Sequence, residues 1–413
     1  MAVINPFICT RPNRAAAHRV AALPYDVYNR KEAKQEILRE PLSFLRIDRA
    51  ETNFGDEVDT YDPKVYVKAK ELLQEMIDQG TLEVDNEECY YVYELVMDGR
   101  SQTGLVACAS VDDYLNNVIK KHENTREDKE LDRIRHVDIC NAQTGPIFLA
   151  YRSKEEINTV IDEAKKEEPL YYFDSPDGIG HHVWRISDRE KISCLKNAFL
   201  KISKIYIADG HHRSASAVKV GLKRRNENPG YTGNERFNYF LSVLFPHDQL
   251  KILPYNRAVR DLNGLSKEQF LNRIKENFEV SEHGSTPCSP EEKASFGMIL
   301  DGIWYRLKAK ESIRNTQDPV ESLDVSILQN HLLSPILGIG DPRVDKRIDF
   351  IGGIRGLGEL ERRTAADMRV AFSMFPTSIT ELFEVSDAGK LMPPKSTWFE
   401  PKLRSGLFIH SLS

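Results

Sequence analysis

Asp-Gly pairs that lie between β-rich runs constrain the fold of this sequence more than any other feature. Asp98-Gly99 separates residues 88–97 from residues 101–110, and Asp301-Gly302 separates two further apolar runs. Asp-Gly readily adopts the positive φ angles of a two-residue hairpin turn, so these runs are expected to pair as antiparallel strands. The regular βαβ order of a parallel doubly wound sheet is absent. The sequence therefore predicts an α+β fold with mixed β-sheets and flanking helices.

Several segments have the spacing and end signals of helices. Asn29 is a candidate cap for a helix over residues 29–39, because Glu32 lies three positions later. Apolar residues recur at helical spacing between Asp62-Pro63 and Gly80. The charged stretch 116–135 has the composition of a solvated helix.

Chain length predicts several domains, because 413 residues exceed the usual size of one. We expect an N-terminal α+β subdomain over residues 1–115, a core over residues 116–260 and a C-terminal α+β subdomain over residues 261–413 that closes the site.

Composition excludes some classes of protein. No apolar run approaches the ~20 residues that span a bilayer, and the N-terminus lacks the pattern of a secretory signal. The net charge of −6, without a dense basic tract, argues against a nucleic-acid-coating protein. The six cysteines are scattered and form no C-x-x-C pair, as expected of reduced thiols. These features predict a cytoplasmic protein without membrane contact.

The densest chemical signal is Asp209-Gly210-His211-His212-Arg213, which follows an apolar strand over residues 204–208 and precedes a helical pattern. A new helix offers free N–H groups and the positive end of its dipole to an anion. Arg213 adds a bidentate cation suited to phosphate, and the histidines add titratable donors. Asp209 is a carboxylate that can hold a divalent cation between phosphates. The motif therefore predicts a nucleotide phosphate site with a metal at Asp209.

Two other segments are candidates for the same site. His122-Glu123-Asn124-Thr125 contains a carboxylate suited to general-base work, and Arg133 follows as a ligand-binding or structural cation. Near the C-terminus, two prolines stiffen the approach to Lys395-Ser396-Thr397-Trp398. The lysine and hydroxyls are suited to phosphate, and Trp398 to stacking or to anchoring the loop.

These motifs together resemble a known family. Asp-Gly-His-His-Arg after an apolar strand resembles the signature of the ParB/sulfiredoxin-like superfamily, in the version carried by free serine kinases. The whole chain is similar to a long bacterial and archaeal family of formerly unknown function, linked to ATP-dependent phosphorylation of free serine. The motifs that carry the likeness occur in this order: Pro6-Phe7, residues 24–27, His122-Glu123 with Thr125, Asp132-Arg133, residues 209–213 and residues 392–402.

The resemblance implies a kinase that phosphorylates free L-serine with ATP or ADP and Mg²⁺. It implies Glu123 as general base, with His122 and Asp209 as further catalytic residues. Its implied nucleotide-binding residues are Gly210, His211, His212, Arg213, Lys395, Ser396 and Thr397. Its implied substrate-binding residues are Asp26, Thr125, Arg133 and Trp398.

Two other functions stay open at this point. One is a ParB-like regulatory nucleotide-binding protein or NTPase without kinase activity, against which the acidic net charge and the missing helix-turn-helix count. The other is a metallohydrolase that uses Asp209, His211 and His212, although adjacent histidines on one helical turn point in different directions. The expected partners are nucleotide and free serine; a homodimer is left open.

Overall fold

The computed structural model describes residues 1–413, which form two compact units. The first unit contains residues 1–250 and 401–413, and the second contains residues 251–400. The second unit is therefore inserted into the chain of the first.

The first unit is built on a nine-stranded sheet. β12 runs parallel to β8, and β11 runs parallel to β6, whereas the other neighbours are antiparallel. The strands, in spatial order, are β6 (Ile119–Lys120), β11 (Ile205–Asp209), β8 (Ile147–Tyr151), β12 (Tyr239–Pro246), β5 (Arg100–Ser110), β4 (Tyr90–Met97), β10 (Gly180–Ile186) and β9 (Tyr171–Asp174), with β1 (Ile4–Asn5) beside β5. The predicted mixed α+β fold is confirmed.

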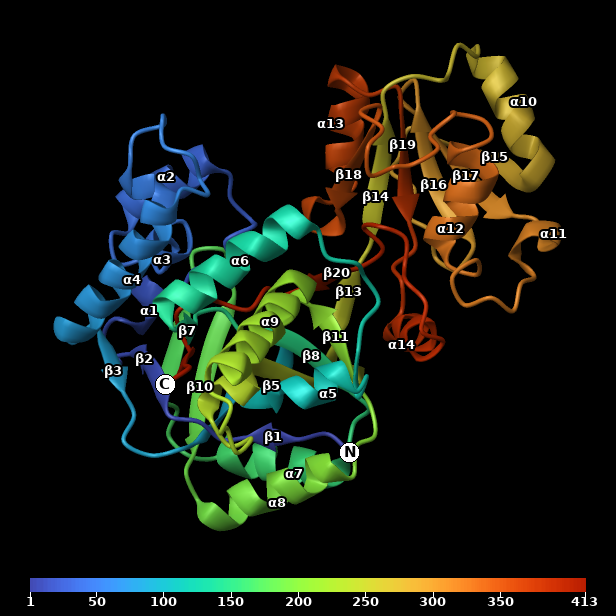
Figure 1. Cartoon of the computed structure of the whole chain (residues 1–413). Coiled ribbons are helices and arrows are strands. Elements are labelled where there is room, and N and C mark those ends of the chain that lie inside the picture. The colour runs from blue at the N-terminus through green and yellow to red at the C-terminus, as the bar shows by residue number, and fades with distance from the viewer. The chain divides into compact units, whose positions relative to one another are not determined.

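Helices pack against this sheet (Figure 1). α7 (Glu155–Ala164), α8 (Arg189–Leu200) and α9 (His211–Glu227) all contribute apolar residues to one core with its strands. α6 (Glu127–Cys140) packs against α9, and α4 (Pro63–Asp78) packs against α6. This stack of helices brings the N-terminal region close to the start of α9.

A four-stranded sheet joins distant parts of the first unit. Its strands are β3 (Leu82–Val84), β2 (Cys9–Pro12), β21 (Ile409–Ser411) and β7 (Ala142–Gln143). The remaining helices of this unit are α1 (Ala17–Val20), α2 (Arg30–Arg39), α3 (Leu45–Asp48) and α5 (Val111–Leu115). Because β21 lies between β2 and β7, residues 401–413 are part of the first unit.

The second unit contains a six-stranded antiparallel sheet and a short strand pair. The sheet order is β15 (Phe278–Gly284), β17 (Ile303–Ala309), β16 (Ser295–Leu300), β19 (Val370–Met374), β14 (Tyr255–Val259) and β18 (Ile348–Gly352). β13 (Lys251–Leu253) pairs with β20 (Trp398–Glu400). The helices are α10 (Lys267–Asn277), α11 (Glu311–Arg314), α12 (Asp324–Leu328), α13 (Gly358–Ala366) and α14 (Ile379–Asp387).

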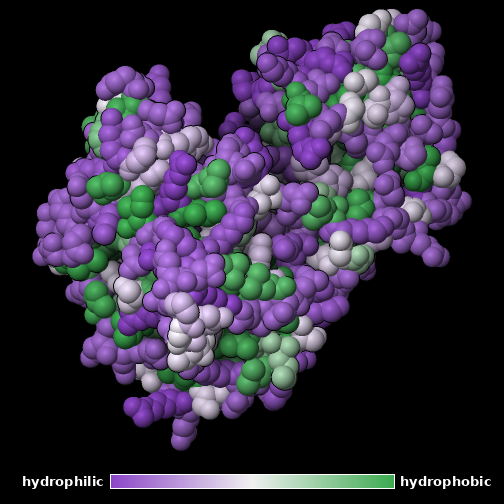
Figure 2. All heavy atoms as spheres, viewed as in Figure 1, coloured by the Kyte–Doolittle hydropathy of each residue, from purple (hydrophilic) through white to green (hydrophobic).

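Apolar side chains are gathered inside the units, and the face shown in Figure 2 is mostly hydrophilic with small separate hydrophobic groups. None of the helices has the length and apolar character needed to cross a bilayer.

Local signals predicted many elements correctly. Asp98 and Gly99 have φ angles of 52° and 75° in the β4–β5 turn, and Asn29 forms a capping box with Glu32 at α2. The helix predicted over residues 116–135 is wrong in its first half. Asn117 has a φ of 59°, which ends α5, and Ile119 then pairs with β11. α6 begins only at Glu127, so His122 and Glu123 lie in a loop rather than on a helix.

Strands from both of the ranges 1–115 and 116–260 enter the same nine-stranded sheet. The division of the chain into three subdomains remains a prediction, and the sheet marks no boundary at residue 115.

Candidate functional site

The Asp209 turn, residues 209–213, connects β11 to α9. β11 ends at Asp209, and Gly210 has a φ of 95° at the N-cap of α9. A Cβ atom at position 210 would lie 3.1 Å from Nε and Nη2 of Arg213. Glycine therefore lets the chain reverse while the arginine folds back over the turn. The first N–H groups of this 17-residue helix have no partner within the helix, as the sequence predicted.

Asp209 lies between two cations. Its Oδ2 is 3.4 Å from Nη2 of Arg213 and 3.5 Å from Nζ of Lys402. Burial acts to raise the pKa of Asp209, but Lys402, Arg213 and His211 outweigh it and hold that pKa well below its usual value. The carboxylate is therefore ionised at neutral pH, and its side chain is 38% exposed. Arg213 also donates through Nη1 to the carbonyl of Pro146 at 2.5 Å.

His122, Glu123 and His211 meet beside this turn. The rings of His122 and His211 lie 4.4 Å apart and nearly perpendicular, and the backbone N–H of His122 donates to Nε2 of His211 at 3.5 Å. Nδ1 of His211 is 3.8 Å from Oε2 of Glu123. Burial lowers the pKa of His211 to about 4 and moves the pKa of His122 well below its usual value. Both imidazoles are therefore neutral at pH 7.

The segment that contains Thr125 is attached to α9. Nε2 of His212 accepts a hydrogen bond from the backbone N–H of Arg126 at 3.0 Å. Thr125 donates to Glu130 at 2.5 Å, and Glu130 pairs with Lys219. Asp26 is exposed and acts on His212 only through its charge, which opposes the effect of burial on the pKa of that histidine. The hydroxyl of Thr125 is thus already engaged within the protein.

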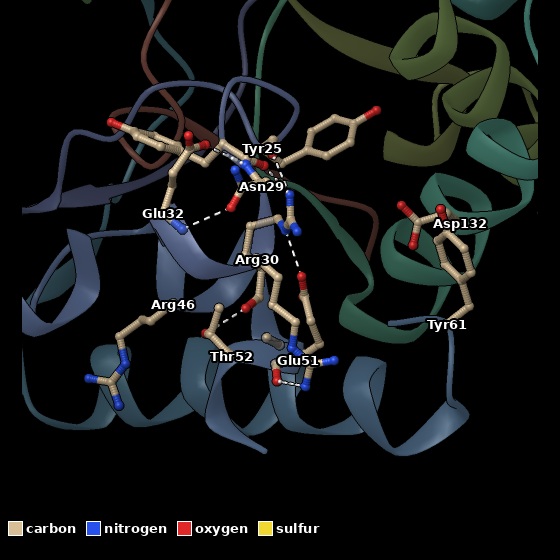
Figure 3. Close-up of polar contacts among 12 residues, drawn as sticks. Tyr25, Asn29, Arg30, Glu32, Arg46, Glu51, Thr52, Tyr61 and Asp132 are labelled. Carbon is tan, nitrogen blue, oxygen red and sulfur yellow. Dashed lines mark hydrogen bonds and ion pairs between the residues drawn. The ribbon is translucent and has the colours of Figure 1, made fainter. Parts of the chain in front are cut away.

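Arg133 lies on α6 in a buried charged network. Its Nε donates to Oδ2 of Asp132 at 2.9 Å, and its Nη2 forms an ion pair with the same oxygen at 2.8 Å. Its guanidinium lies 4.0 Å from the ring centre of Tyr25. Oδ1 of Asp132 accepts from Tyr66 at 2.9 Å. Figure 3 shows Tyr25 and Glu51 of the N-terminal segment together with Asp132 of α6.

The residues predicted near the C-terminus belong to the second unit. Lys395 has a φ of 57°, and Arg257 donates to its carbonyl at 3.1 Å. Ser396 is buried and donates to the carbonyl of Pro393 at 2.6 Å. Trp398 packs edge-on against Tyr255, and a Cβ atom at Gly352 would lie 2.8 Å from its ring. These contacts order the loop, and the nucleotide-binding role of Lys395, Ser396 and Thr397 and the substrate-binding role of Trp398 remain predictions.

Sequence reasoning missed Lys402 and Asp48 as functional candidates. Lys402 follows β20 and returns to the first unit, where it approaches Asp209. Asp48 ends α3 and accepts a hydrogen bond from Thr144 at 2.9 Å. Lys402 is the last residue of the motif at residues 392–402, which was a local signal for it. Asp48 lies in no such motif.

The metallohydrolase hypothesis finds no support in the geometry, because no group of three His, Cys, Asp or Glu residues is arranged to hold a metal ion. A Mg²⁺ ion carried by nucleotide phosphates needs only one or two protein carboxylates, and the role of the ionised Asp209 as such a ligand remains a prediction.

A family model described as "Protein of unknown function (DUF1015)" matches residues 4–326. The chain belongs to the DUF1015 family. The comparison of this DUF1015 protein with curated proteins found no match.

Solved structures resemble this DUF1015 protein at low identity. A free serine kinase in complex with AMP has a TM-score of 0.34 and 16% identity, over 73% of this chain and 91% of that chain. A conserved hypothetical protein from Pyrococcus furiosus has a TM-score of 0.35 and 14% identity, over 76% and 96%. SbnI with a C-terminal truncation, from Staphylococcus aureus, has a TM-score of 0.39 and 10% identity, over 73% and 85%.

Proposed function

We propose that this DUF1015 protein is a kinase that transfers a phosphoryl group from ATP or ADP to the hydroxyl of free L-serine. The observation that carries the proposal is that the start of α9, which is suited to bind an anion, lies beside a half-buried carboxylate from a distant loop. Glu123 reaches the Asp209 turn through His211, although 87 residues lie between positions 123 and 211.

The Asp209 turn is suited to hold the transferring phosphates. Free N–H groups at the start of α9 and the positive end of its dipole favour a polyanion, and Arg213 adds a charged donor. Mg²⁺ held by Asp209 and the phosphates would neutralise charge on the transferring group. The resemblance of the motif to the ParB/sulfiredoxin-like superfamily supports the same placement of the phosphates.

Glu123 is suited to accept the proton of the attacking hydroxyl. The serine Oγ forms a bond to the terminal phosphorus while the bond from phosphorus to the bridging oxygen of the nucleotide breaks. The hydroxyl proton passes to the Glu123 carboxylate, and the shortened nucleotide carries away the electron pair. His211 lies beside Glu123, with Nδ1 3.8 Å from Oε2, and it is neutral at pH 7 because its pKa lies at about 4.

The first test is formation of O-phosphoserine from L-serine with ATP or ADP and Mg²⁺. Glu123→Gln is expected to lower kcat by about 100-fold or more while ADP still binds, because the amide cannot take the proton. Glu190→Gln, on the exposed first turn of α8, is the matched control and should keep full activity. Mass spectrometry of the product and calorimetry of ADP binding measure the two effects.

The regulatory alternative gives a different result. A ParB-like nucleotide-binding protein would bind or hydrolyse nucleotide without phosphorylating serine or any other small hydroxyl compound, and Glu123→Gln would then change no product. That outcome would end the kinase proposal.

We also propose that the protein works in the cytoplasm. All six cysteines are free thiols and five of them are buried, which suits a reducing compartment.

A further inference from the structure

Two small cavities in the first unit share one wall. The first has a volume of about 30 Å³ and reaches Arg213 and Thr144, and the second has a volume of about 50 Å³ and reaches Tyr61 and Tyr66. The residues that line both are Tyr25, Asp48, Arg133 and His136. Since a water molecule needs roughly 10–15 Å³ of such space, each cavity has room for a small polar group but not for a nucleotide. We call them the head-group cavities.

Two charged side chains on the shared wall are more than nine-tenths buried, and each has one atom that makes no hydrogen bond to the protein. Arg133 is 8% exposed and uses Nε and Nη2 on Asp132, whereas Nη1 makes no hydrogen bond to the protein. Asp48 is 5% exposed and uses Oδ1 on Thr144, whereas Oδ2 makes no hydrogen bond to the protein. Buried charged groups are normally fully paired, so a cation and an anion with spare bonding capacity beside the same cavities call for a ligand.

The other wall residues hold this arrangement in place. The ring of Tyr25 packs on the guanidinium of Arg133, which fixes its plane. Arg49 donates to the carbonyl of Tyr25 at 3.1 Å and pairs with Glu51 at 2.6 Å, so the segment that carries Tyr25 is itself anchored. His136 contacts the carbonyl of Ile47 at 3.3 Å, and burial and Arg133 lower its pKa. A neutral His136 leaves Arg133 and Asp48 as the opposed charges.

We propose that the head-group cavities bind the zwitterionic head of a free α-amino acid, with its carboxylate on Nη1 of Arg133 and its ammonium on Oδ2 of Asp48. This inference rests on the proposed kinase function and names how its acceptor is recognised. A lone carboxylate would be repelled by Asp48 and a lone ammonium by Arg133, so the pair selects a ligand that carries both charges.

Arg213 connects these cavities to the Asp209 turn. It lines the first cavity, and its Nη2 lies 3.4 Å from Asp209. The same guanidinium therefore borders both the amino-acid head and the phosphate site.

The test measures binding by calorimetry in the presence of ADP and in its absence. L-Serine is expected to bind at least about 10-fold more tightly than 3-hydroxypropionate, which lacks the ammonium, and than ethanolamine, which lacks the carboxylate. Equal binding of all three compounds would overturn the proposal.

Asp48→Asn and Arg133→Met test the two contacts. Each is expected to weaken L-serine binding by about 10-fold or more, with ADP binding unchanged. Asp48→Asn carries the test if Arg133→Met does not fold, because asparagine keeps the acceptor for Thr144. Asp85→Asn is the matched control, since Asp85 is also buried but uses both oxygens on Arg11 and Tyr91.

The outcomes separate this inference from the reaction. If phosphoserine forms but Asp48→Asn keeps the KM for serine, the cavities are not the acceptor site and the kinase function stands. If wild-type protein binds serine, Asp48→Asn does not, and no phosphoryl transfer occurs, the amino-acid site stands and the kinase function fails.

Discussion

Gly210 is the residue on which the geometry of the Asp209 turn most directly depends. Its φ of 95° is disfavoured for any other residue, by about 1–2 kcal/mol, and a Cβ atom there would crowd the guanidinium of Arg213. Gly210→Ala should therefore lower the melting temperature and weaken ADP binding. Gly230→Ala is the control, because Gly230 has open space around it. Equal ADP affinity in both variants would contradict this reading of the turn.

His211 gives the site a pH dependence that can be isolated. Its pKa is about 4 in the folded chain against about 6.5 when unfolded, so between these values the unfolded chain binds more protons. The stability from neutral His211 is complete above pH 6.5 and is lost as the pH falls toward 4. Compared with wild type, His211→Gln should lose less stability on acidification, by up to about 1.4 kcal/mol per pH unit. Urea unfolding between pH 4 and 7 measures the free energy of unfolding of both proteins. If it falls equally with pH in wild type and in His211→Gln, the prediction is wrong.

At this scale, prediction from the sequence worked where the signal was local. The order Asp209, Gly210, His211 marks a strand end and a helix start within a few residues. Lys402 and Asp48 gave no comparable signal, because their partners Asp209 and Thr144 are distant in the chain and meet them only after folding.

Among the elements, α4 and α6 together position Arg133. Tyr66 of α4 donates to Asp132 of α6, which in turn holds Arg133. Tyr66→Phe removes a hydrogen bond to a buried carboxylate and should lower the free energy of unfolding by about 1.5–3 kcal/mol. Tyr172→Phe is the control, because Tyr172 is 71% exposed. Chemical denaturation measures the free energy of unfolding of both variants. If Tyr66→Phe lowers it as little as Tyr172→Phe does, the hydrogen bond between α4 and α6 does not stabilise the fold.

Hairpins and capped helices were predictable as elements, because Asp98-Gly99 and the Asn29–Glu32 box determine their own conformations. The loop that carries Glu123 was not predictable from the local sequence. Its charged composition favours a helix, but the pairing of Ile119 with β11 overrides that local preference.

For the whole molecule, the second unit enters and leaves the first at adjacent points. Lys251 and Glu400 are direct partners in the β13–β20 pair. We therefore expect that replacing residues 251–400 with a short Gly-Ser linker gives a first unit that unfolds cooperatively, as measured by circular dichroism on heating.

Deleting residues 401–413 from the full chain should instead destabilise the first unit, because β21 and Lys402 are lost. If the first unit stays equally stable without residues 401–413, the assignment of these residues to the first unit is wrong.

The return of residues 401–413 also sets an order of events during synthesis. The ribosome makes residues 251–400 before Lys402 and β21, so the nascent first unit must wait for the whole insertion to emerge. Until then Asp209 lacks one of its two cations, and β2 lacks one of its two neighbouring strands. A growing chain therefore cannot assemble this charge arrangement until the inserted unit has been translated.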